Sequence, residues 1–266
     1  MVAMDPLRIV MGLVISAAIG GLAYKRGSLT ASGWLGAILT GTATFGLGGW
    51  PHGVTLVFFF VSSTLWSRLK KQQKVALEQT MFEKGSRRDI WQALANGGLA
   101  ALICCAIPLW PEHLLTINIL FAATMATVAA DTWATELGVL FGGTPRLITT
   151  LKPAPKGTSG AVSGPGTVAA IAAAASVAVV FSVVDGLFSA PVVLLITAAG
   201  VFGCLVDSLL GATVQRLYQG SDGPTERAFA SDGTPLPLIR GWRWLSNDLV
   251  NFGSSLAGAL LAWMFV

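Results

Sequence analysis

Four carboxylates occupy positions where the surrounding sequence is strongly apolar. Asp131, Glu136 and Asp207 stand inside long apolar stretches, and Asp248 stands near the start of another. An ionisable side chain within a membrane segment is costly and is usually functional. Carboxylates that lie close together repel unless a cation holds them, and Mg²⁺ is bound through one or two carboxylates plus substrate phosphates. We predict these four residues to be catalytic, with Asp131, Glu136 and Asp207 as ligands of Mg²⁺.

A basic segment between two apolar stretches supplies a candidate phosphate site. Residues 152–160 read Lys-Pro-Ala-Pro-Lys-Gly-Thr-Ser-Gly, and a helix is expected to follow directly. Backbone N–H groups and the dipole at a helix start favour anions. The segment lacks the Gly-x-x-x-x-Gly-Lys-Ser/Thr string of a P-loop, and such a turn is often only a helix cap. The residues that we predict to bind phosphate or nucleotide are Arg146, Lys152, Lys156, Gly157, Thr158 and Gly160.

Polar side chains at helical spacing point to a cavity beside these groups. Arg88, Gln92 and Asn96 follow an i, i+4, i+8 pattern, which places them on one helix face. We predict a polar cavity lined by Arg88, Gln92, Asn96, Thr135, Asn247 and Asn251. An alternative stays open, in which the Asp and Asn side chains only join helices through hydrogen bonds.

The composition indicates the kind of scaffold that must position these residues. The chain has 266 residues, of which 53% are hydrophobic and 11% charged, with a mean hydropathy of +0.69. Soluble domains carry about 25% charged residues. A disordered chain and an ordinary water-soluble domain are therefore excluded. The net charge of +4 comes from loops between apolar stretches, so we expect no nucleic-acid partner.

The apolar stretches predict an all-α fold. A membrane-spanning helix needs about 20 mostly apolar residues. We predict a polytopic transmembrane bundle of about eight spans, forming one integral membrane domain over residues 1–266. Two neighbouring stretches, 33–49 and 52–67, are short enough that a re-entrant pair is an alternative. The eight stretches are 7–24, 33–49, 52–67, 91–109, 115–140, 159–183, 188–215 and 247–265.

The distribution of basic residues predicts the orientation. Of the 17 Lys and Arg residues, all but Arg8 fall in the first, third, fifth and seventh loops of an eight-span chain. Basic loops mark the cytoplasmic side. Both termini are then non-cytoplasmic, and residues 68–90 form a basic cytoplasmic loop in which 70–82 could be helical. The polar groups of the spans all fall in the cytoplasmic leaflet, which predicts an active site on that side.

Six strings together resemble a known family. The chain is similar, from the third span to its C-terminus, to the integral membrane family of transmembrane protein 19, whose plant and cyanobacterial members include phytyl-phosphate kinase. The paired Asp-rich runs of membrane prenyltransferases are absent. The matching strings are 92–97, 131–138, 145–150, 156–160, 207–212 and 247–252.

The resemblance implies a reaction and its partners. It implies CTP-dependent phosphorylation of a prenyl monophosphate, with phytyl phosphate as the first candidate, in isoprenoid or tocopherol metabolism. The expected partners are the prenyl phosphate, a nucleoside triphosphate and the lipids of a plasma or thylakoid membrane. The alternatives are a transporter or flippase of isoprenoid phosphates and a structural protein. A transporter usually places its polar groups near the midplane between repeats, whereas here they gather toward one face.

Overall fold

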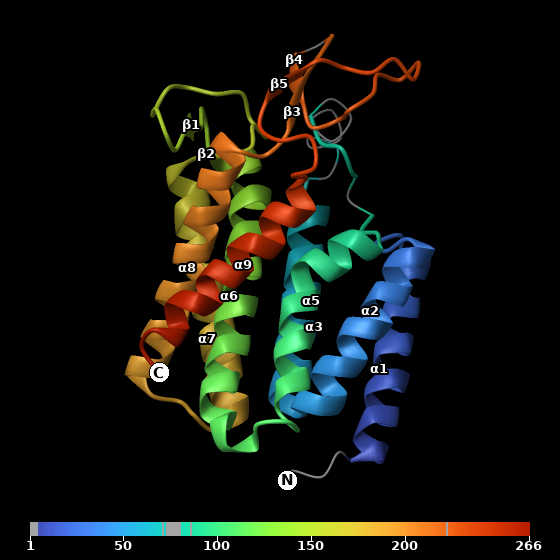
Figure 1. Cartoon of the computed structure of the whole chain (residues 1–266), viewed down its shortest axis with the longest axis vertical. Coiled ribbons are helices and arrows are strands. Elements are labelled where there is room, and N and C mark those ends of the chain that lie inside the picture. Colours follow the sequence, from blue (N-terminus) through green and yellow to red (C-terminus); the bar gives the residue numbers. More distant parts are fainter. Residues whose placement is uncertain (1–4, 71, 73–80, 86, 222) are drawn as a thin grey trace.

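The computed structural model describes residues 5–70, 72, 81–85, 87–221 and 223–266, and they form a bundle of helices (Figure 1). Each of the eight apolar stretches contains one α-helix, so the positions of the helices were predicted well. In the described ranges the helices are α1 (Pro6–Lys25), α2 (Ala31–Ala43), α3 (Trp50–Arg68), α5 (Ile90–Ala106), α6 (Leu114–Phe141), α7 (Gly164–Asp185), α8 (Ala190–Thr213) and α9 (Asn247–Trp263). A π-helix, η1 (Thr44–Gly48), continues α2, and a 3₁₀ turn, η2 (Pro111–His113), precedes α6.

Four of the helices are long and apolar enough to cross a membrane, judged by length and composition alone. They are α1, α7, α8 and the continuous segment of η2 and α6. The other four are shorter or less apolar. Helix α2 has 13 residues, which at about 1.5 Å per residue is shorter than the ~30 Å hydrocarbon core. The chain is thus mostly helical and suited to a membrane, and the count of eight spans stays a prediction.

The core is built from small residues on α6, which touches most other helices. Ala122, Ala126 and Ala129 are fully buried in the centre of the bundle. Glycines on the neighbouring helices permit a close approach to α6: a Cβ on Gly203 of α8 would lie 2.4 Å from the Thr127 side chain. Small residues let membrane helices pack closely, and this contact fixes the height of α8 relative to α6.

Two small sheets correct the all-α prediction. Strand β1 (Arg146–Leu147) pairs antiparallel with β2 (Ala161–Val162). Strands β3 (Leu217–Gly220), β4 (Gly223–Thr225) and β5 (Leu238–Arg240) form a three-stranded antiparallel sheet in the order β4-β3-β5. These strands are too short for a periodic sequence signal, and they lie in polar connections that sequence reasoning treated as loops.

The start of α7 also differs from the prediction. A helix was expected directly after Gly160, but β2 intervenes and α7 begins at Gly164. The Ser163 side chain accepts the N–H of Gly166 at 3.2 Å, which makes Ser163 the N-cap. The proposed phosphate-binding turn is therefore a loop that precedes a strand and not the start of a helix.

The two ends of the bundle differ in which segments they carry. Both sheets and residues 81–85 and 87–89 gather at one end, while the start of α1 and the end of α9 lie in the half of the molecule away from the strands (Figure 1). Arg8, the exception to the charge pattern, lies away from the sheets and donates to the carbonyl oxygens of Gly46 (2.9 Å) and Leu47 (3.4 Å). Residues 71, 73–80 and 86 of the predicted basic loop lie outside the described residues, as does most of the possible helix over 70–82.

The orientation can be measured with single cysteines at exposed positions of the two ends. In a chain with Cys104, Cys105 and Cys204 replaced by Ala, Asp232→Cys lies in the exposed connection between β4 and β5, and Glu112→Cys lies in η2. Because the basic loops predict the cytoplasmic side, an impermeant maleimide should label Asp232→Cys only from the cytoplasm and Glu112→Cys only from the opposite side. Labelling of both positions from one side would contradict the topology.

Candidate active site

A polar cavity of about 300 Å³ opens at the strand end of the bundle. Side chains from α5, α6, α8 and α9 line it together with the loop that precedes α7. The structure brings most of the predicted site residues to this cavity, although they are spread over some 160 positions of the sequence. The predicted residues that line it are Arg88, Gln92, Asn96, Asp131, Thr135, Glu136, Lys156, Gly157, Thr158, Gly160, Asp207, Asn247 and Asp248.

Three predicted residues do not line the cavity. Arg146 and Lys152 are exposed, and the Arg146 guanidinium donates to the carbonyl oxygen of Leu151 at 2.8 Å within its own loop. Asn251 lies behind the lining. With its amide nitrogen turned toward the neighbouring acceptors, it donates to Asp207 Oδ2 at 3.1 Å and to the Asn247 carbonyl oxygen at 3.2 Å. Asn251 thus orients a lining carboxylate.

The centre of the site is the pair of carboxyl groups of Asp131 on α6 and Asp207 on α8. The two groups lie within hydrogen-bonding reach of each other, and Asp207 is buried. Ser254 of α9 donates to Asp207 Oδ2 at 3.0 Å. Two carboxylates at such a distance cannot both remain charged unless a proton or a cation lies between them. The pair is therefore a place where a cation would be stabilised.

The other two predicted carboxylates have protein partners. Glu136 accepts a hydrogen bond from Ser67, and Asp248 forms an ion pair with Lys84. Among the described residues, no group of three or more His, Cys, Asp or Glu is arranged to hold a metal ion by itself. Mg²⁺ needs only one or two protein carboxylates when substrate phosphates supply further oxygens. The Asp131–Asp207 pair fits that donor set, and the participation of Glu136 stays a prediction.

The loop before α7 supplies a lysine and two glycines to the cavity. Lys156 Nζ donates to the Val139 carbonyl oxygen at 3.1 Å, in the last turn of α6, where a cation is favoured by the helix dipole. Gly157 and Gly160 both have φ of +81°, and a Cβ on Gly160 would lie 2.3 Å from the Ala212 backbone nitrogen. Close packing against α8 therefore accounts for Gly160, while Lys156 and Gly157 face the cavity.

Sequence reasoning missed a second polar cluster at the cavity wall. Ser159 donates to Glu226 Oε1 at 2.7 Å, and the Gln215 amide donates to the same oxygen at 2.8 Å. Burial raises the pKa of the Glu226 carboxyl above its usual value. Ser159 lies in a string that had been singled out, but Gln215 and Glu226 lie in a polar connection with no pattern that marks them.

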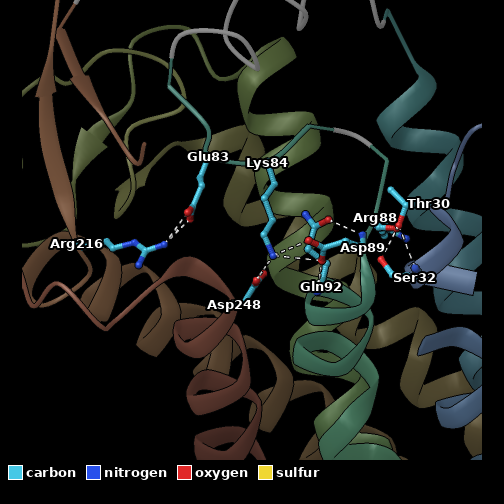
Figure 2. Close-up of polar contacts among 10 residues, drawn as sticks. Thr30, Ser32, Glu83, Lys84, Arg88, Asp89, Gln92, Arg216 and Asp248 are labelled. Atoms are coloured by element: carbon cyan, nitrogen blue, oxygen red, sulfur yellow. Dashed lines mark hydrogen bonds and ion pairs between the residues drawn. The ribbon is translucent and has the colours of Figure 1, made fainter. Parts of the chain in front are cut away.

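Residues 81–85, which we call the strap, contribute to the cavity wall and are held by three ion pairs of Glu83 and Lys84 (Figure 2). Lys84 bridges Asp248 of α9 and Asp89, the N-cap of α5, and Arg216 binds both carboxylate oxygens of Glu83 at 2.7 Å. Partial burial opposes the charge of Lys84, but its contacts with Asp248 and Asp89 outweigh that effect and raise its pKa above the usual 10.5.

Asp89 has a second role that ties the strap to the helix. Its side chain accepts the Gln92 N–H at 2.9 Å, and the Gln92 side chain accepts the Asp89 N–H at 3.1 Å, which is a capping box. Burial acts against its charge, but the hydrogen bonds from Gln92 and Lys84 lower the pKa of Asp89 below the usual 3.8. The start of α5, a wall of the cavity, is thus fixed by the same ion pair as the strap.

A bundle of apolar helices is typical of an integral membrane protein, and the carboxylate pair in the polar cavity at one end is its candidate site for a charged ligand. The chain belongs to the family described as Integral membrane protein DUF92, whose model matches residues 14–259. This match confirms that the six strings indicate membership of an integral membrane family. No solved structure matches the chain.

Curated relatives cover most of the chain. Protein PGR of Arabidopsis thaliana is 33% identical over 277 residues, covering 96% of this chain and 94% of its own. An uncharacterized membrane protein of Synechocystis is 31% identical over 249 residues, covering 92% and 85%. The chloroplastic Protein VTE6 of Arabidopsis thaliana is 27% identical over 238 residues, covering 88% of this chain and 64% of its own.

The strap gives a prediction about pH. Replacing Lys84 by Met leaves Asp89 and Asp248 without their shared cation, so residues 81–85 should exchange backbone hydrogens faster than in the parent protein. The lowered pKa of Asp89 means that its contribution is present above pH 3.8 and is lost as the pH falls through its lower folded value. The raised pKa of Lys84 means that its contribution is present below pH 10.5 and is lost only above that value.

Hydrogen exchange of residues 81–89 across this range is the measurement. We expect protection to be constant from about pH 5 to 10 and to fall on the acid side. Lys25→Met, at the exposed end of α1, is the matched control and should change nothing in this segment. Unchanged protection in Lys84→Met would show that the ion pairs of Lys84 do not hold the strap.

Proposed function

We propose that the protein is a CTP-dependent kinase that converts a prenyl monophosphate, with phytyl phosphate as the first candidate, to the diphosphate. The observation that carries this proposal is the Asp131–Asp207 pair, which lines a polar cavity at one end of an apolar bundle. The similarity of the six strings to a family that includes phytyl-phosphate kinase supports the same reaction. The cavity volume of about 300 Å³ is at the lower end of the range of small-molecule sites.

Asp131 and Asp207 would hold Mg²⁺, which when bound neutralises the charge of the nucleotide phosphates. An oxygen of the acceptor monophosphate forms the new bond to the γ-phosphorus, and the bond between that phosphorus and the oxygen bridging it to the β-phosphate breaks. CDP leaves with that oxygen. The acceptor is already an anion near neutral pH, so no strong base is needed. Positioning and electrostatics carry most of the catalysis in such transfers.

The remaining residues of the cavity have binding roles in this scheme. Lys156 and the loop at Gly157 and Thr158 would contact nucleotide phosphates, and Arg88 would contact the acceptor phosphate. Asn251 and Ser254 hold Asp207 in place through hydrogen bonds at 3.1 and 3.0 Å. Arg146 and Lys152 are exposed on the outer loop, where they would attract anionic ligands without forming part of the cavity wall.

A transporter or flippase of isoprenoid phosphates is the second candidate. Such a protein needs polar groups along the route between the leaflets. In the middle of α6 the fully buried residues are apolar apart from Thr124 and Thr127, whose hydroxyls donate to carbonyl oxygens of their own helix, Leu120 at 2.9 Å and Ala123 at 3.0 Å. The described part of α6 offers no polar path, which favours the enzyme.

The reaction can be tested with purified protein, CTP, Mg²⁺ and phytyl phosphate, with CDP as the measured product. Asp131→Asn and Asp207→Asn keep size and hydrogen bonding but remove charge, so CDP formation should fall by two or more orders of magnitude. Without metal, both variants should be as stable to heat as the parent or more so, because one of two repelling carboxylates is neutralised. Asp185→Asn, at the far end of α7, is the control.

Two outcomes would contradict the proposal. Full activity in Asp131→Asn or Asp207→Asn would place the chemistry elsewhere, and a loss of stability without metal would assign these residues to helix packing. Absence of CDP with every prenyl monophosphate tried would exclude the kinase. Movement of a prenyl phosphate between leaflets in proteoliposomes would then indicate the transporter.

A further inference from the structure

A second cavity, of about 90 Å³, lies among α1, α2, α3 and α5. Its wall is largely apolar and includes Ile15 and Ile19 of α1 and Leu56, Val57 and Phe60 of α3. Apolar cavities of roughly this size stay dry and bind hydrocarbon ligands. The chemistry of the wall therefore suits an apolar group and does not suit a nucleotide.

The lining of the cavity extends along α3. The lining residues of this helix are Gly53, Leu56, Val57, Phe59 and Phe60, of which all but Phe59 follow the i, i+3, i+4, i+7 spacing of one helix face. Seven residues at 1.5 Å per residue correspond to about 10 Å along the axis. A narrow apolar space of that length fits several carbons of an extended chain better than a compact molecule.

The apolar cavity and the polar cavity are neighbours with three lining residues in common. Arg88, Gln92 and Asn96 line both. The Arg88 guanidinium lies over the rings of Phe59 and Phe60, 5.8 Å from each centroid, and Arg88 directly precedes the Asp89 N-cap of α5. A cation is thus placed where the apolar wall ends and the polar wall begins.

We propose that the apolar cavity binds the head-proximal part of an isoprenoid chain whose phosphate lies at Arg88 in the polar cavity. This inference rests on the proposed function, because it assigns the acceptor of that reaction to a place. A ligand with an anionic head and an apolar tail matches both the cation at Arg88 and the apolar wall. The rest of a long tail would continue into the bilayer beside α1, whose outward side chains Leu13 and Val14 are exposed.

A matched pair of variants on α3 tests the assignment. Val57→Phe fills the apolar cavity, whereas Val61→Phe, one turn further along, adds the same group at a position that is 47% exposed and lines neither cavity. Val57→Phe should raise the KM for prenyl monophosphate at least tenfold, the effect of losing about two buried methylene groups. The KM for CTP should not change, and Val61→Phe should leave both constants unchanged.

A photoreactive analogue tests the unmodified protein, so the result does not depend on folding of a variant. A prenyl monophosphate carrying a diazirine in its first isoprene unit should form adducts on peptides of α1, α2, α3 or α5. Unlabelled prenyl monophosphate should suppress the adducts, and phosphatidylglycerol at the same concentration should not. Equal suppression by phosphatidylglycerol would make the cavity a general lipid site and would overturn the inference.

The outcomes separate this inference from the proposed function. CDP formation with adducts only on α7 or α8 would support the kinase and overturn the placement of the tail. Adducts in the apolar cavity without CDP formation would support the placement and overturn the kinase. A Val57→Phe protein that folds and keeps its KM for prenyl monophosphate would overturn the placement whatever the adducts show.

Discussion

The contact between Asp131 and Asp207 is the constraint on which the rest of the site depends. Thr127 lies one turn before Asp131 on α6, and Gly203 lies one turn before Asp207 on α8. A Cβ on Gly203 would clash with Thr127 at 2.4 Å, so the absence of a side chain there lets the two carboxyl groups meet. An unpaired carboxylate at this depth is costly. Helices α6 and α8 can therefore pack this closely only with the hydrogen bonds from α9 and with a proton or cation shared between the two carboxyl groups.

The ion pairs at the polar end of the molecule position the strap at the cavity wall and add little to the free energy of unfolding. Ion pairs that are partly exposed contribute only about 0–1 kcal/mol each, and Lys84 and Glu83 are partly exposed. Their effect is geometric, because Lys84 connects the strap to α9 and to the cap of α5, and Arg216 connects it to the segment that follows α8. Several weak ion pairs together are enough to hold the strap in one position.

The sequence predicted the helices and most of the cavity wall because both leave strong local signals. An apolar stretch of helical length marks a helix, and a carboxylate such as Asp207 stands out within it. Contacts formed in the polar connections carry no such signal. Lys84 and Asp248 are 164 residues apart, and Ser159, Gln215 and Glu226 meet only because β3 and β4 fold back over α8. The short strands lie in the same polar connections and were not predicted for the same reason. Helix α7 begins after the Ser163 N-cap and not, as predicted, directly after Gly160.

The depth of the polar cavity would strengthen the interaction of the Asp131–Asp207 pair with a charged ligand. Arg88 precedes the Asp89 N-cap of α5 and is not part of the helix, contrary to the predicted helical stripe, whereas Gln92 and Asn96 lie one turn apart on α5. Asn96 follows the N-cap by seven residues, so the polar wall reaches about 10 Å into the bundle. Charges interact more strongly at that depth than in water, because the effective dielectric constant is lower. Donors and charges that are already fixed in place need no reorganisation during a reaction. A nucleotide would enter from the aqueous end and a lipid acceptor from the side of α1 and α3, so the two substrates would meet at the junction marked by Arg88.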